Sequence, residues 1–145
     1  MYYIKKHHEG IEIITNAKRI IKNTSLQRYL DTLCMGVLTT LEGRQKAMQK
    51  LTGYQRNTPL YIDEHLCFIQ TNHLQDPTNI AINVTKVLSV KAQGQATIFI
   101  FEDTTRLKVD RPLQKIQKKL KRAEVTLALF FAMMKTLLSK KVFSK

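Results

Sequence analysis

The chain has 145 residues, of which 43% are hydrophobic, and this composition is typical of one folded domain rather than a disordered chain. Its 24 lysines and arginines against 11 acidic residues give a net charge of +13, which favours a polyanionic partner because so large a surplus repels itself in a compact fold. No apolar stretch resembles a secretory signal or approaches the roughly 20 residues of a membrane-spanning helix, so we expect a soluble cytoplasmic protein with free thiols.

The N-terminal part of the chain predicts two short strands followed by two helices. Segments 11–17 and 19–23 are rich in isoleucine and are separated by a turn. Segment 24–35 places its leucines on one helical face, and a second helix is expected from residue 41 to about residue 51. The boundary signals are Asn16 in the turn, Thr24 or Ser25 as an N-cap, and Gly36 and Gly53 as helix ends.

The middle of the chain predicts strands. Segments 59–62 and 66–71 have the pattern of a β-hairpin with an acidic tip. Three further runs, 79–92, 95–103 and 105–110, are rich in isoleucine, valine and phenylalanine and are joined by short turns. Because links this short join antiparallel neighbours, we expect a meander and not a parallel sheet.

The last segment predicts a long amphipathic helix that begins near Pro112. Apolar residues recur every three or four positions from Leu113 to Leu137, while segment 111–122 carries six basic side chains and no acidic one. Beyond Glu124 the polar face is lost. A helix of about 25 residues measures nearly 40 Å, so its end should extend beyond the domain and bind a second copy, unless it folds back as a core helix.

These elements predict a single α+β domain, mostly an antiparallel sheet, with two short helices in its N-terminal half and a long basic amphipathic helix at its C-terminus. We divide the chain into a binding domain, 1–124, and a helical extension, 125–145. The residues expected to make the contact between copies are Leu127, Phe130 and Met134.

The positive charge is concentrated at the two ends of the chain. Residues 58–110 carry a net charge of −2, whereas residues 1–57 carry +6 and residues 111–145 carry +9. A charge that serves only solubility would be spread more evenly, so the asymmetry favours a defined basic surface. The alternative is a helix that covers a sheet and merely turns a solvated basic face to water.

Groups that could carry catalysis or bind a metal are scarce. The sequence His7-His8-Glu9 lies near an N-terminus expected to fray, and Asp63-Glu64-His65 lies at the expected hairpin tip, so both are interpreted as surface turns. Cys67 with His65 and His73 lacks a fourth ligand and a recognised zinc spacing. No glycine-rich phosphate loop is present. We therefore expect no enzyme, no cofactor and no metal site.

Several short motifs, taken in order, carry a family resemblance. They are Gly43-Arg44 at the start of a helix, Pro59 to Ile62, Phe68 to Thr71, Ile82-Asn83, then Phe101, Leu107 and Val109, and a helix with Leu113 and Gln117. With this order and spacing, residues 24–123 resemble the competence transcription factor family, ComK, of Gram-positive bacteria. The chain departs from the family pattern at Gln70, at Ala81, and after Ala123.

The resemblance implies an activator of DNA-uptake genes that binds paired AT-rich boxes of double-stranded DNA, largely through the minor groove, as associating dimers. It also implies an adaptor for Clp-type proteolysis as a partner. An RNA-binding domain remains a rival, and so does a membrane-surface or protein-interaction module. The residues predicted to contact nucleic acid are Arg44, Lys46, Lys50, Arg111, Lys115, Lys118, Lys119, Lys121 and Arg122.

Overall fold

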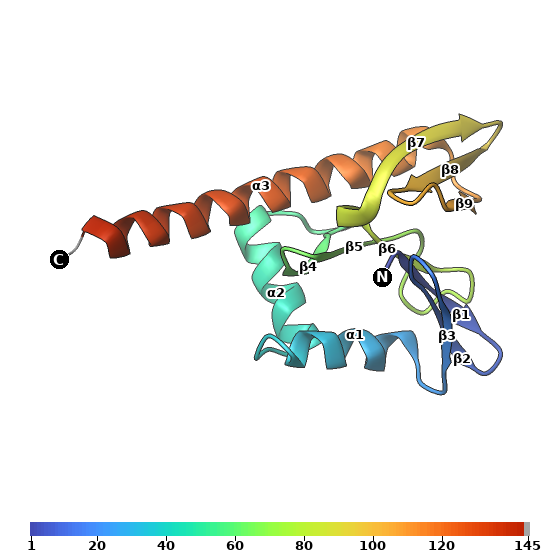
Figure 1. Cartoon of the computed structure of the whole chain (residues 1–145), viewed down its shortest axis with the longest axis horizontal. Coiled ribbons are helices and arrows are strands. Elements are labelled where there is room, and N and C mark those ends of the chain that lie inside the picture. Colours follow the sequence, from blue (N-terminus) through green and yellow to red (C-terminus); the bar gives the residue numbers. More distant parts are fainter. Residues whose placement is uncertain (144–145) are drawn as a thin grey trace.

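The computed structural model describes residues 1–143, with side chains described as far as Thr136 (Figure 1). It is an α+β domain with two antiparallel sheets and three helices. The first sheet has the order β3-β2-β1-β6-β5-β4, and the second has the order β7-β8-β9. The strands are β1 (Tyr3–His7), β2 (Gly10–Ile14), β3 (Arg19–Lys22), β4 (Leu60–Asp63), β5 (Leu66–Gln70), β6 (Ile80–Asn83), β7 (Val87–Gln93), β8 (Ala96–Phe101) and β9 (Arg106–Val109). The helices are α1 (Leu26–Met35), α2 (Leu41–Thr52), the 3-10 turn η1 (Val84–Lys86) and α3 (Leu113–Phe143).

The six-stranded sheet forms the middle layer. One of its faces packs against α1 and α2 through Ile4, Phe68 and Ala81, which have essentially no exposed surface. The other face meets the three-stranded sheet and α3 through a second cluster that includes Phe99 and Ile116. Because neighbouring residues on one strand alternate between the two faces, strands such as β1 and β5 supply both clusters.

Strand β1 was not predicted, and the expectation of a frayed N-terminus was wrong. The strand lies between β2 and β6, with Tyr3 in register with both Ile14 and Ile82. Ile4 is completely buried. The run of lysines and histidines that follows obscured the strand in the sequence, although Lys5, Lys6 and His7 belong to it and are only partly exposed.

The predicted run 79–92 is two strands that belong to different sheets. The short turn η1 separates them, and the buried side chain of Asn83 fixes it by accepting hydrogen bonds from Thr85 N at 3.3 Å and Thr85 Oγ1 at 2.9 Å. Strand β6 therefore lies between β1 and β5, while β7 starts the second sheet. The predicted meander is confirmed only for β7, β8 and β9.

The first two helices are confirmed, α1 with the N-cap Ser25 that the sequence indicates and α2 with an N-cap, Thr40, that was not predicted. Ser25 Oγ accepts a hydrogen bond from Arg28 N at 3.1 Å, and Thr40 Oγ1 accepts one from Gly43 N at 2.9 Å, which satisfies orphan donors of each first turn. Gly53 ends α2 in the left-handed conformation, with φ of 76°.

Helix α3 crosses the domain and continues beyond it, so that its C-terminal half projects from the body (Figure 1). Ile116 and Ala123 are buried beneath its first half. Further along, Phe131 is 73% exposed and Met134 is 54% exposed, although Met134 lies on the side of the helix that carries Ile116. The overhang predicted from the helix length is thus present. None of the helices, as far as their residues are described, is long and apolar enough to span a membrane.

The buried thiol of Cys67 gives a test of this core. Burial raises the pKa of Cys67 to about 12, whereas an exposed cysteine ionises near pH ~8.5. The unfolded chain releases this proton first, so the free energy of unfolding should fall by up to about 1.4 kcal/mol per pH unit between pH ~9 and ~12. Denaturant unfolding at several pH values should show this fall, which Cys67→Ala should reduce. Rapid alkylation of Cys67 in the native protein at pH 8 would contradict the packing.

Candidate nucleic-acid interface

The basic residues at the start of α3 line an open pocket of about 480 Å³. Positions 115, 118, 119 and 122 fall on one flank of α3, because steps of three and four residues advance it by about one turn. Arg111, two residues before the helix, lines the same pocket, and we call these five residues the basic flank. The opposite wall is the segment after β5 together with Asn57. The residues that line the pocket are Asn57, Thr71, Asn72, His73, Asp76, Arg111, Lys115, Lys118 and Lys119.

Two of these cations are held by backbone carbonyls. The Lys119 ammonium donates to Gln70 O at 2.6 Å, and Arg111 Nε donates to Thr71 O at 3.4 Å. Desolvation lowers the pKa of Lys119, and the nearby charges of Arg111 and Lys115 lower it further. A carbonyl oxygen carries only a partial charge, so these contacts fix the side chains in place without neutralising them.

Arg122 forms the third such contact. Its guanidinium lies over the ring of Tyr54, 4.5 Å from the centroid, and it donates a hydrogen bond to the backbone oxygen of Arg56. Both partners belong to the loop between α2 and β4, which we call loop 53–58. Arg122 therefore ties this loop to the basic flank of α3.

Asp76 is the one acidic residue that lines the pocket among the residues described. Its carboxylate accepts hydrogen bonds from Asn72 Nδ2 at 3.0 Å, Thr78 N at 2.8 Å and Thr78 Oγ1 at 2.7 Å. These bonds, that of Asn72 first, lower its pKa to about 2. Asp76 therefore orders the segment after β5 and remains ionised, while the four cations around it keep the pocket positive.

The structure separates the other predicted contacts from this pocket. Lys121 lies about 100° around the helix from Arg122 and so points away from the flank. Lys46 is exposed and pairs with Glu42 at 3.0 Å. Arg44 is half-buried, and its buried Nε has no hydrogen-bond partner among the described residues. Lys50 is exposed on α2 but does not line the pocket.

Loop 53–58 was not among the predicted binding residues. A second pocket, of about 170 Å³, lies on the other side of this loop, and Asn57 lines both pockets. The side chains of Gln55, Arg56 and Asn57 are exposed. One sequence signal could have indicated this loop. The polar run Gln-Arg-Asn lies between the glycine that ends α2 and Pro59, and a simple turn does not need such a run. The second pocket is lined by Gln45, Gln49, Gln55, Arg56, Asn57, Thr58, Pro59, Leu60 and Gln70.

The three residues predicted to join copies of the chain do not share one environment. Leu127 packs against the protein's own core, and the Phe130 ring stacks on Tyr61 with centroids 4.2 Å apart. Met134 is exposed, and it is accompanied by Phe131, which the prediction left out. The apolar surface open to a partner is therefore farther along α3 than the sequence indicated.

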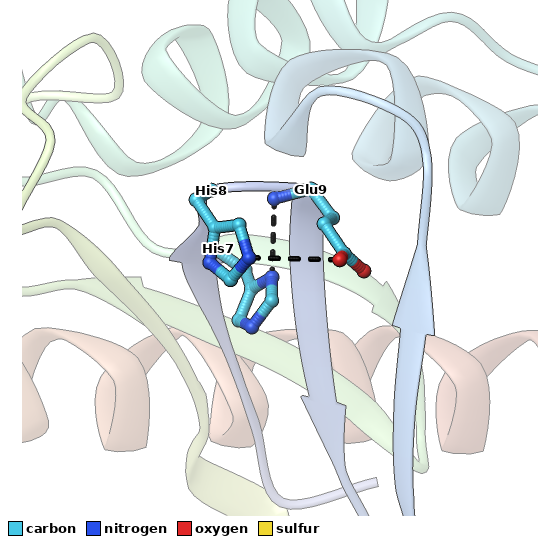
Figure 2. Close-up of side chains that lie close together, drawn as sticks. All are labelled: His7, His8 and Glu9. Carbon is cyan, nitrogen blue, oxygen red and sulfur yellow. Dashed lines mark hydrogen bonds and ion pairs between the residues drawn. The ribbon is translucent and has the colours of Figure 1, made fainter.

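One group with the composition of a metal site occurs among the residues described: His7, His8 and Glu9, at the turn between β1 and β2 (Figure 2). Their possible ligand atoms lie within 4.8 Å of one another. However, His7 Nδ1 already accepts a hydrogen bond from Glu9 N at 3.1 Å, and Glu9 Oε1 lies 3.5 Å from His8 Nε2. These contacts between chain neighbours account for the arrangement as a hairpin turn, which matches the interpretation of these residues as surface residues.

A comparison with family models shows the family of the chain. The model described as ComK protein matches residues 2–135. The chain belongs to the ComK family. The match extends well beyond the 24–123 resemblance on both sides, so it includes β1 and most of α3. No curated protein and no solved structure matches the chain. The ComK family is one of transcription regulators and points to a role in competence.

Proposed function

We propose that this ComK-family protein is a cytoplasmic DNA-binding activator of DNA-uptake genes, and that it binds AT-rich boxes through the minor groove. The observation that carries the proposal is the basic flank of α3, where Arg111, Lys119 and Arg122 are held by backbone carbonyls. Lys115 and Lys118 are exposed beside them and form no ion pair among the described residues. Five positive charges on one flank therefore remain available to phosphates.

The spacing of the flank suits a nucleic-acid backbone. Side chains three or four positions apart on a helix lie about 5–6 Å from one another, so neighbouring cations can contact successive phosphates of one strand. Such contacts release condensed counterions and supply most of the affinity of a sequence-tolerant DNA contact.

The burial of the aromatic residues weighs against the rival proposal of single-stranded RNA binding. Phe68, Phe99 and Phe101 are completely buried, whereas single-strand readers stack bases on exposed rings. The Tyr54 ring lies beneath the Arg122 guanidinium, which covers a face that a base would need. Duplex DNA requires no such platform.

The exposed end of α3 supports association between copies as part of the same function. Phe131 and Met134, which lie about 60° apart around the helix, form an exposed apolar surface on the projecting segment, and paired boxes in DNA call for paired protomers. The adaptor for Clp-type proteolysis, which the family resemblance implies, is a proposed partner of the protein as well.

The first prediction of this proposal concerns the salt dependence of DNA binding. Replacing Lys115 and Lys118 by alanine should weaken binding to every duplex and reduce the slope of log K against log salt by about 0.9 per lost contact, hence roughly 2 in total. Titrations by fluorescence anisotropy at several salt concentrations measure both quantities.

The matched control removes the same charge elsewhere. Lys91 and Lys108 are exposed and flank Ile98 in register on the second sheet. Their double alanine variant should keep the wild-type slope. If both double variants lose the same slope, the attraction is a general effect of net charge and the flank is not the DNA surface.

The second prediction concerns association. The double variant Phe131→Asp/Met134→Asp should remain folded, because both side chains are exposed, but it should sediment as a monomer where the wild type forms a larger species. By contrast, Phe130→Asp removes the stack on Tyr61 and should lower the free energy of unfolding by about 1–3 kcal/mol. A double variant with the wild-type sedimentation behaviour would place the contact between copies elsewhere.

A further inference from the structure

The basic flank of α3 can contact the phosphates of DNA, but the helix is too wide to enter the minor groove. An α-helix with side chains is about 10–12 Å wide, whereas the minor groove of B-form DNA is about 6 Å wide. Helix α3 therefore fits outside an undistorted minor groove, with its lysines on the phosphates that border it. A single extended or looped stretch of chain beside the helix is narrow enough to enter.

Loop 53–58 is a looped stretch of this kind and lies beside the basic flank. Asn57 lines the basic pocket together with Lys115 and Lys118, and it also lines the second pocket with Gln55 and Arg56. The loop thus forms the ridge between the two pockets, immediately beside the charged flank. A duplex that places its phosphates on the flank brings its groove to this ridge.

The backbone of the loop is fixed at several points. Arg122 lies over Tyr54 and donates to the backbone oxygen of Arg56. Within the loop, Thr58 Oγ1 donates to Tyr54 O at 3.1 Å, and Asn57 has a φ of 53°, a left-handed conformation that asparagine tolerates better than most residues. The ordering of this segment is therefore accomplished in the free protein, which reduces the entropy cost of binding.

The side chains of the loop have the chemistry that the groove requires. Gln55, Arg56 and Asn57 are all exposed, and Arg56 forms no ion pair among the described residues. The minor groove of an A·T pair presents only acceptors, whereas a G·C pair adds the guanine amino donor. The N–H donors of the amides and the guanidinium match the first, whereas the guanine amino group of the second opposes the guanidinium, which has donors only. A narrow AT-rich groove also attracts arginine through its negative potential.

We infer that loop 53–58 is the element that enters the AT-rich minor groove, with Arg56 and Asn57 as the specificity-determining residues and Arg122 as the residue that positions them. The inference rests on the proposed DNA-binding function. Arg44, one of the residues predicted to contact nucleic acid, is less suited to this role because its Nε is buried.

The test measures affinity for an AT-rich and a GC-rich duplex of equal length at several salt concentrations. Arg56→Ala and Asn57→Gly should each reduce the ratio of the two dissociation constants by about tenfold, within the range known for a lost base contact. Glycine keeps the left-handed backbone at position 57 available. Arg56→Lys keeps the charge but loses the planar fork of donors, so it should retain the salt slope and lose much of the ratio.

Two further variants distinguish recognition of the AT-rich sequence from general electrostatic attraction to DNA. Lys118→Ala, which removes one charge from the flank, should weaken both duplexes equally and leave the ratio unchanged. Arg122→Lys keeps the charge but cannot stack and fork in the same way, so it should reduce the ratio and expose the loop to trypsin after Arg56, without changing the salt slope.

The outcomes distinguish this inference from the proposed function. If the wild type prefers the AT-rich duplex and the Arg56 and Asn57 variants keep that preference, the loop is not the reader, although DNA binding stands. If the wild type shows no preference between the duplexes, minor-groove recognition of AT-rich boxes and the reading loop are both overturned.

Discussion

The buried amide of Asn83 is the contact on which the arrangement of the layers depends. Its Nδ2 donates to Met1 O and to His65 O, both at 2.9 Å, and its Oδ1 accepts from Cys67 N at 3.2 Å. These bonds join the N-terminus, the β4–β5 hairpin and the end of β6 at the point where the chain leaves the first sheet. The position of this point sets the direction in which β7 leaves the first sheet. The direction of β7 in turn sets the position of the second sheet and of the start of α3. The basic flank lies at the other end of β5, where Lys119 donates to Gln70 O and Arg111 donates to Thr71 O.

The pairing of cations with carbonyls instead of carboxylates is what makes this flank a binding surface. Elsewhere in the chain acidic side chains form ion pairs with basic ones. Glu12, for example, is buried and pairs with Lys5 and Arg19. On α3 the carbonyls of Gln70, Thr71 and Arg56 hold the cations, and the one pocket acid, Asp76, is engaged with its own segment. The surface is therefore ordered and positive at once, and a polyanion can gain affinity without first displacing internal ion pairs.

Local signals in the sequence were enough for most of the elements but not for all of them, nor for their assembly. Ser25, Gly53 and the spacing along α3 predicted helices and ends that the structure confirms, because caps and periodicity act within a few residues. Strand β1 pairs with the distant β6 as well as with its neighbour β2, and the Asn83 amide also bonds Met1 and His65; local patterns do not reveal such distant partners. The same applies to loop 53–58: the bond from Arg122 to Arg56 spans 66 positions. The basic residues predicted on α3 lie together because the helical period places them on one side. The basic residues predicted on α2 lie outside the basic pocket.

In the proposed complex α3 contacts the phosphates, while the protein distinguishes the AT-rich sequence in the minor groove. Replacing the A·T pairs of a bound box by inosine·cytosine pairs tests it most directly, because such pairs keep the minor-groove pattern of A·T and present the major-groove pattern of G·C. The account predicts that the substituted duplex binds with nearly the affinity of the AT-rich one and with the same salt slope. Binding reduced to the level of a G·C duplex would mean that the sequence is distinguished in the major groove, and would contradict the account.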